Sequence, residues 1–280
     1  MAEITISSED FQKFREFFYR KTGILFEDSK RYFVDKRLIE RIEATGYANF
    51  RSYFTFMRFQ VSGEEIQTLT NIMTVNETYF FREEYQFKCL VDSLLPEVVK
   101  TKAPGSTIRI WSIPSSSGEE AYSIALYLTE YWPDIERWDV ELISSDIDTS
   151  ILKKARQGLY SARSVQHLPS KLLQRHFKRL PGDEYQISDD FRQAVEFTRV
   201  NLAEIADTRA YRGFDIIFCR NLLIYFDDLS RRQAAEVFFD ALNPGGFICL
   251  GHSESMSRIT SVFKVRKFPD AIVYQKPEAR

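Results

Sequence analysis

From about residue 107 the chain alternates regularly between strand-like and helix-like segments, and few folds are compatible with that rhythm. The strand-like segments are short, apolar and rich in β-branched and aromatic residues: "TIRIWSI", "DVELISSDID", "FDIIFCRNLLIYF" and "GGFICLGHS". The helix-like segments between them are "GEEAYSIALYLTEYW", "TSILKKARQG" and "LSRRQAAEVFFDALNPGG". Such alternation indicates βαβ units and a mostly parallel sheet covered on both faces. We therefore expect an α/β domain.

The residues before this domain have helical periodicity instead. Ser8 is expected to cap a first helix that ends at Gly23, and a second helix, "SKRYFVDKRLIERIEATG", is expected to end at Gly46. Apolar side chains recur three or four residues apart in both. On one face of the second helix Lys30, Arg37 and Arg41 line up. This indicates a small, mildly basic all-α unit.

We place the helical N-terminal domain at residues 1–72 and the α/β domain at residues 73–280. One region breaks the βα rhythm, because "KRLPGDEYQ" has a Pro-Gly-Asp turn between short strand-like pieces. Residues 162–200 are therefore expected to form a small antiparallel β insert.

Composition excludes several classes of protein. The net charge of −2 lacks the basic excess typical of nucleic-acid binders. No apolar run is long enough to span a membrane, and "MAEITISSED" does not resemble a signal peptide. The three cysteines are widely spaced and are expected to be buried thiols in a cytoplasmic protein.

A parallel sheet binds ligands beyond the carboxyl ends of its strands, so the residues that follow each strand are informative. After "TIRIWSI" the loop "PSSSGEEAYS" leads into a helix, but it matches neither the dinucleotide nor the P-loop fingerprint. Glu119 and Glu120 open that helix. They can receive a cationic group such as an ammonium, or they can simply be acids that favour a first helical turn.

Polar residues also follow the next two strands. Asp146 ends "DVELISSD", where an acidic side chain commonly binds ribose hydroxyls, whereas Asp148 is equally suited to cap the next helix. Arg220 and Asn221 end "FDIIFC" abruptly. Together these signals suit a nucleoside that carries an amino-acid tail and no phosphate, which describes S-adenosylmethionine.

With these motifs the sequence resembles the CheR family, the protein-glutamate O-methyltransferases of chemotaxis receptors. The resemblance covers nearly the whole chain and rests on "NETYFFR", "SGEEAYSIA", "SSDID", "ARQGLY", "VNL" and "FCRNLLIYF". It implies a Rossmann-like methyltransferase domain after an all-α domain. One departure is "IPSSSGEEAYS", where family members often have smaller residues ahead of "STGEEPYS".

Carried over position by position, the resemblance implies a site for S-adenosylmethionine and its product S-adenosylhomocysteine. Arg82 would bind the methionine carboxylate, Glu120 the ammonium and Asp146 the ribose. The implied set is Asn76, Thr78, Arg82, Glu120, Asp146, Asn201, Leu202, Arg220 and Asn221. Within it, Asn201 and Leu202 would border the adenine.

Two further side chains are candidates for a direct role in methyl transfer. Arg37 would orient the target glutamate, and Tyr225 would place its hydroxyl near the methyl group. The alternatives are a solvated helix face for Arg37 and a core aromatic for Tyr225. The three histidines lack the spacing of metal ligands, so no metal is expected.

The implied partners are methyl-accepting chemotaxis receptors, recognised on their cytoplasmic helical bundle. The short turn in "KRLPGDEYQ" resembles members that do not need a receptor's C-terminal tail peptide. We expect a monomer with no nucleic-acid partner and no direct membrane insertion. Two rival functions are a cofactor-binding signalling scaffold without activity and a methyltransferase acting on nucleic acid or a small molecule.

Overall fold

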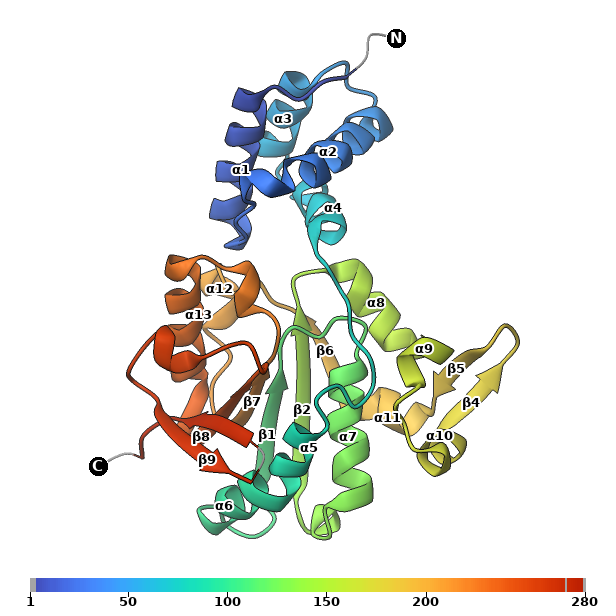
Figure 1. Ribbon diagram of the computed structural model, residues 1–280, viewed down its shortest axis with the longest axis vertical. Coiled ribbons are helices and arrows are strands. Elements are labelled where there is room, and N and C mark those ends of the chain that lie inside the picture. The colour runs from blue at the N-terminus through green and yellow to red at the C-terminus, as the bar shows by residue number, and fades with distance from the viewer. Residues whose placement is uncertain (1–3, 270, 279–280) are drawn as a thin grey trace.

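The computed structural model describes residues 4–269 and 271–278. Figure 1 shows a helical bundle that lies above one edge of an α/β domain. The four helices are α1 (Ser8–Thr22), α2 (Arg31–Thr45), α3 (Phe50–Phe59) and α4 (Glu64–Met73), with a 3-10 turn at Asp28–Lys30. A separate core of buried apolar side chains holds them together, including Phe14, Phe18 and Leu38.

The ends of the first two helices follow local rules. Gly23 and Gly46 adopt left-handed φ values of 73° and 76° and end α1 and α2 as predicted. The predicted cap at Ser8 is wrong by one residue. Ser7 is the N-cap: its Oγ accepts from the N–H of Asp10, whose carboxylate accepts from the N–H of Ser7. This capping box decided the start of the helix, since either serine could provide one acceptor.

The α/β domain is built on a seven-stranded sheet in the order β6-β2-β1-β7-β8-β10-β9. The first five strands are parallel, and β10 and β9 are antiparallel additions at one edge. Their bounds are β1 Thr107–Ser112, β2 Asp139–Asp146, β6 Val195–Arg199, β7 Phe214–Cys219, β8 Leu242–Leu250, β9 Lys264–Phe268 and β10 Ala271–Gln275. The chain leaves β1 for β2 on one side, and β7 pairs on the other, so a crevice opens between β1 and β7.

Helices cover both faces of this sheet, which confirms the predicted fold class. On one face lie α5 (Tyr85–Cys89), a π-helical turn (Leu90–Leu94), α6 (Leu95–Lys100), α7 (Glu119–Tyr131) and α8 (Thr149–Gln157). On the other lie α12 (Ile205–Thr208) and α13 (Asp228–Ala241). Short 3-10 turns occur at Ile135–Arg137, Leu223–Tyr225 and Met256–Arg258.

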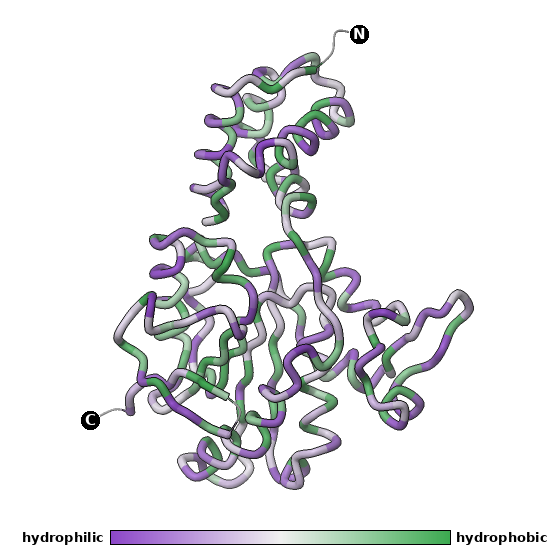
Figure 2. The backbone as a smooth tube through the Cα atoms, viewed as in Figure 1, coloured by the Kyte–Doolittle hydropathy of each residue, from purple (hydrophilic) through white to green (hydrophobic). Residues whose placement is uncertain are grey.

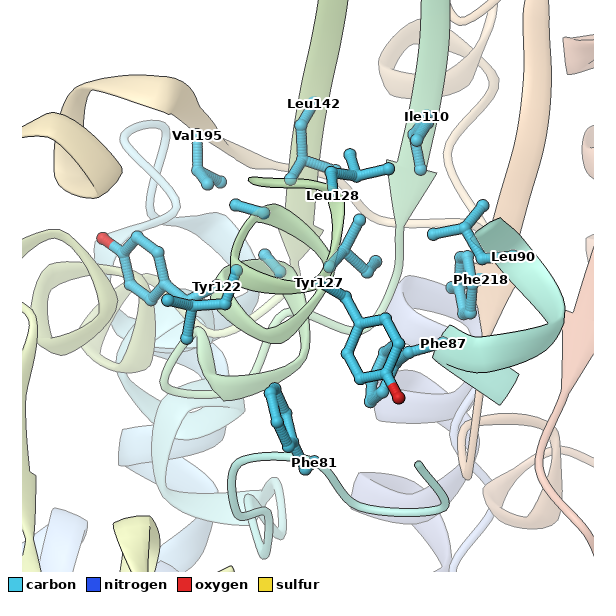
Figure 3. Close-up of a cluster of buried hydrophobic side chains, with 14 of the residues drawn as sticks. Phe81, Phe87, Leu90, Ile110, Tyr122, Tyr127, Leu128, Leu142, Val195 and Phe218 are labelled. Atoms are coloured by element: carbon cyan, nitrogen blue, oxygen red, sulfur yellow. The ribbon is translucent and has the colours of Figure 1, made fainter. Parts of the chain in front are cut away.

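The strands and the first of these faces form the larger core. Figure 3 shows Phe81, Phe87, Tyr127 and Phe218 converging beside α7, and Figure 2 shows hydrophobic residues running through the central strands. Phe81 belongs to the segment that links the helical domain to α5. Its burial anchors that link against α7, which matters for the site below.

The insert between β2 and β6 projects from the side of the sheet (Figure 1). It contains β3 (Leu159–Ser161), α9 (Ala162–Val165), α10 (Ser170–His176), β4 (Phe177–Leu180), β5 (Glu184–Ile187) and α11 (Asp189–Ala194). The small sheet is antiparallel, in the order β3-β5-β4. Strand pairing thus places the small sheet within 159–187. We expected the insert over 162–200, but β6, at residues 195–199 of that range, pairs with β2 in the main sheet. Local patterns could not assign short strands to one sheet or the other, because that depends on pairing.

Within the described residues, no helix combines the length and apolar character that crossing a bilayer requires. The three cysteines are free and buried, as predicted.

Candidate functional site

A cavity of about 790 Å³ lies between the helical domain and the carboxyl ends of β1, β2 and β7. Helical-domain residues such as Phe26 and Phe33 form its upper wall. Most of the predicted site residues line it: Asn76, Thr78, Arg82, Glu120, Asp146, Arg220, Asn221 and Tyr225. These come from the interdomain link, from α7 and from the ends of β2 and β7, so the fold brings together residues far apart in the sequence.

The loop after β1 is shaped by two unusual backbone conformations. Ser116 has a φ of 49° and directs its N–H to Asp146 Oδ2 at 2.8 Å. Gly118 has a φ of 94°, and a Cβ there would lie 3.1–3.2 Å from Ala155, Tyr122 and Phe197. Only glycine suits that close approach. Ile113 and Pro114, where the sequence departs from the usual family pattern, therefore precede the residues that form the turn.

Asp146 is buried at the end of β2, and its carboxylate faces the cavity. Its Oδ2 accepts from Ser116 N–H and its Oδ1 accepts from Asp148 N–H at 3.0 Å. Burial raises the pKa of Asp146 to about 7, although both backbone hydrogen bonds oppose the shift. An ionised carboxylate offers about four acceptor positions, so two remain for a pair of ribose hydroxyls.

Glu120 stands at the start of α7 beside a buried arginine. Its Oε1 accepts from Ser112 Oγ at 2.9 Å and its Oε2 accepts from Arg220 at 3.0 Å. Arg220 also lies 3.4 Å from Glu83 and donates to the carbonyl of Arg82 at 2.6 Å. Burial raises the pKa of Glu120, and the charge of Arg220 opposes this. Two carboxylates share one guanidinium here, which leaves negative charge for an ammonium group.

The segment "NETYFFR" forms one wall of the cavity. Phe80 and Phe81 point into the core, and Phe81 N–H donates to Ser123 Oγ at 3.0 Å. Asn76 donates to Asp148 Oδ2 at 2.9 Å, while Arg82 donates to the carbonyl of Glu77 at 3.0 Å. The two phenylalanines therefore anchor the link, and the polar residues on either side of them face the cavity.

Asp148 also caps α8, as expected from the sequence. Its Oδ1 accepts from the N–H groups of Ser150 and Ile151 at 2.8 and 3.0 Å, while its Oδ2 accepts from Asn76 and Thr74. One carboxylate therefore joins the helix start to the interdomain link.

Sequence reasoning missed the residue that shapes the turn after β7. Glu254 accepts from the N–H groups of Asn221, Leu223 and Gly251 at 2.8, 2.8 and 2.9 Å. Arg231 donates to the carbonyl of Leu223 from the other side at 2.9 Å. The motif "GHSE" contains this acid, and a carboxylate forms strong hydrogen bonds with backbone N–H groups.

Tyr225 follows this turn and lines the cavity mouth with 42% of its surface exposed. Burial of part of the ring raises the pKa of Tyr225, so its hydroxyl stays protonated and can donate a hydrogen bond. It is therefore a surface aromatic at the cavity and not a core residue.

Three predicted site residues do not line the cavity within the described part of the chain. Asn201 donates to the carbonyl of Lys21 at 2.6 Å, which ties the end of β6 to α1, and Leu202 is buried in the second core. Arg37 donates to the carbonyl of Ile72 at 2.5 Å and lies over the ring of Phe33. The adenine-bordering and glutamate-orienting roles stay predictions.

The described residues contain no cluster of three or more potential metal ligands among His, Cys, Asp and Glu. The polar side chains that line the cavity do suit S-adenosylmethionine: the carboxylates of Asp146 and Glu120 can accept from its ribose and ammonium, and Arg82 can donate to its carboxylate. This strand order, with an acid at the end of the second strand and no phosphate-binding loop, defines a Rossmann-like methyltransferase that uses S-adenosylmethionine.

The chain belongs to the CheR methyltransferase family. Residues 76–272 match the family model "CheR methyltransferase, SAM binding domain", and residues 9–74 match "CheR methyltransferase, all-alpha domain". It is 57% identical to chemotaxis protein methyltransferase 2 of Vibrio cholerae over 99% of this chain and 96% of that protein. It is 38% identical to chemotaxis protein methyltransferase 2 of Pseudomonas aeruginosa, covering 90% and 89% of the two chains. The chemotaxis protein methyltransferase of Salmonella typhimurium is 34% identical, covering 94% and 89%.

Proposed function

We propose that this protein transfers the methyl group of S-adenosylmethionine to glutamate side chains of methyl-accepting chemotaxis receptors and releases S-adenosylhomocysteine. One observation carries the proposal: Asp146, Glu120 and Arg82 surround a single cavity at the carboxyl ends of the sheet. Family membership and the relatives' chemotaxis function support the same substrate class.

The cavity residues would divide the cofactor between them. Arg82 uses one nitrogen for the carbonyl of Glu77, and its other donors are available for the methionine carboxylate. Glu120 would receive the ammonium, and Asp146 would accept from the ribose hydroxyls. S-adenosylmethionine, when bound, supplies an activated methyl group. Asn76, Thr78, Arg220 and Asn221 complete the proposed cofactor set.

The target needs no general base. A glutamate carboxylate, with a pKa near 4.3, is ionised at neutral pH and is already a nucleophile. The protein's task is to hold that carboxylate in line with the methyl group, and positioning of this kind can contribute roughly 7–11 kcal/mol. Tyr225, at the mouth of the cavity, would place its hydroxyl beside the entering carboxylate.

The predicted role of Arg37 as the residue that orients the target glutamate also belongs to the proposal. Its contacts with Ile72 and Phe33 favour an indirect contribution, because Phe33 lines the cavity. Lys30, which directly precedes α2, lines the cavity itself and would be better placed than Arg37 to meet an acidic receptor. The test compares the receptor KM of Arg37→Lys and Arg37→Ala. If Arg37→Ala raises KM and Arg37→Lys does not, the positive charge of Arg37 matters and the planar geometry of its guanidinium does not.

We further propose a cytoplasmic monomer that acts on the receptor's helical bundle without a tail peptide, a nucleic acid or membrane insertion. The turn of the insert is short, with β4 ending at Leu180 and β5 starting at Glu184. Asn201 and Leu202, which lie shortly after the end of β6, keep their proposed place beside the adenine. Domain limits of 1–72 and 73–280 remain part of the proposal.

The test is calorimetric titration with S-adenosylmethionine and S-adenosylhomocysteine, followed by transfer of a tritiated methyl group to receptor-containing membranes. Binding of both, with base-labile label on receptor glutamates, is the expected result. Binding without transfer would favour the signalling scaffold instead. Absence of binding would overturn the assignment of the cavity.

A further inference from the structure

Four large apolar side chains surround the opening of the cofactor cavity and are exposed to solvent. They are Leu25, Val75, Ile224 and Tyr225, with 41%, 56%, 47% and 42% of their surfaces accessible, and all four line the cavity. We call them the mouth patch. Single exposed apolar residues are ordinary, whereas several that border one opening mark an interaction site.

The patch is assembled from three separate segments. Leu25 follows α1, Val75 belongs to the interdomain link, and Ile224 and Tyr225 lie in the 3-10 turn after β7. Ile24 and Phe226 form an isolated antiparallel bridge. This pairing brings Leu25, which follows Ile24, next to Tyr225, which precedes Phe226. The helical domain and the methyltransferase domain therefore share this patch.

Charged residues line the same cavity as these apolar ones. They are the basic residues Lys30 and Arg231 and the acids Glu27, Asp227 and Asp228. Both signs are present, so the opening does not suit a uniformly charged partner such as nucleic acid. It suits an amphipathic segment that brings apolar and charged side chains together.

We propose that the mouth patch binds the apolar side chains that flank the target glutamate on a receptor helix. A helix is about 10–12 Å wide with its side chains, so its glutamate can enter the cavity only if the helix rests on the rim. Residues three and four positions from that glutamate share its face of the helix and would contact the patch. This inference rests on the proposed receptor-methylating function and adds a determinant of which glutamates are methylated.

The experiment compares Leu25→Ser and Ile224→Ser with Ile272→Ser, which removes a 58% exposed isoleucine from β10 that does not line the cavity. Steady-state methylation of receptor-containing membranes gives KM and kcat, calorimetry gives cofactor affinity, and thermal melting reports folding. Each mouth variant should raise receptor KM about fivefold, since burying less apolar surface weakens binding. Cofactor affinity, kcat and melting temperature should stay as in the control.

An unchanged receptor KM in both mouth variants would overturn the inference. So would a wild-type dimer, seen by sedimentation, that these substitutions dissociate, because a second copy would then cover the patch. If the wild-type protein binds cofactor but methylates no receptor, the proposed function itself fails, and that result is visible before any variant is made.

Discussion

The carboxylate of Glu254 accepts a 2.8 Å hydrogen bond from the backbone N–H of Asn221, a non-glycine residue with a φ of 58°. The same carboxylate accepts from Leu223 N–H and Gly251 N–H. It therefore holds the turn after β7 in a conformation that L-residues rarely adopt. Asn221 and Tyr225, both proposed site residues, depend on that turn for their positions.

Replacing Glu254 with glutamine should weaken cofactor binding by about tenfold, because the amide keeps one acceptor and turns an N–H toward backbone donors. Calorimetry of S-adenosylmethionine binding measures the effect. The control is Glu97→Gln, which alters an ion pair with Arg266 outside the cavity lining. Equal affinity in both variants would mean that the turn is held by other contacts.

Cofactor affinity should depend on pH through Asp146. Burial raises the pKa of its carboxyl to about 7, and only the ionised form accepts from both ribose hydroxyls. The contribution is therefore complete above that pKa and lost as pH falls below it, so affinity at about pH 6 should be close to tenfold weaker than at about pH 8. Asp146→Asn should bind weakly with a flat profile over this range. A wild-type affinity that does not change across the range would contradict the assignment.

Gly118 should not tolerate a methyl group. Gly118→Ala places a Cβ 3.1 Å from Ala155 and Tyr122 at a φ of 94°, and we expect a loss of about 2–4 kcal/mol in the free energy of unfolding together with weaker cofactor binding. Gly105→Ala is the matched control. It also has a positive φ, 78°, but nothing lies within 4 Å, so it should cost only about 1–2 kcal/mol. Chemical denaturation compares the two, and equal losses would show that backbone strain alone matters.

The ion pair between half-buried Arg41 and buried Glu65 should stabilise the helical domain. Arg41 donates to both oxygens of Glu65 at 2.9 and 2.8 Å, and Tyr53 donates to the same carboxylate at 2.6 Å. Glu65→Ala removes the acceptor of the buried Tyr53 hydroxyl and of Arg41, whose side chain keeps 24% of its surface exposed, so unfolding should become easier by about 1–3 kcal/mol. Removing the exposed Glu9, which pairs with Lys13, should cost less than about 1 kcal/mol. Similar melting curves for the two variants would refute the distinction.

Local features of the chain could be predicted because they depend on near neighbours. The helix ends at Gly23 and Gly46 follow from the left-handed conformation that glycine adopts freely. The alternation of strands and helices indicated the parallel sheet, and the acid after the second strand indicated the ribose site. These signals are short-range, so a single sequence contains them.

Other parts of the site required the tertiary structure. Glu254 and Asn221 are brought together only when the end of β8 lies beside the end of β7. Arg37, for which helical spacing indicated a basic face and the resemblance a role beside the target glutamate, donates to the carbonyl of Ile72, because α4 packs against that helix. Helical periodicity shows which residues share a face, whereas packing decides what covers it. The residue types therefore predicted which chemical groups line the cavity. The shape of its walls and mouth depends on contacts between segments far apart in the chain.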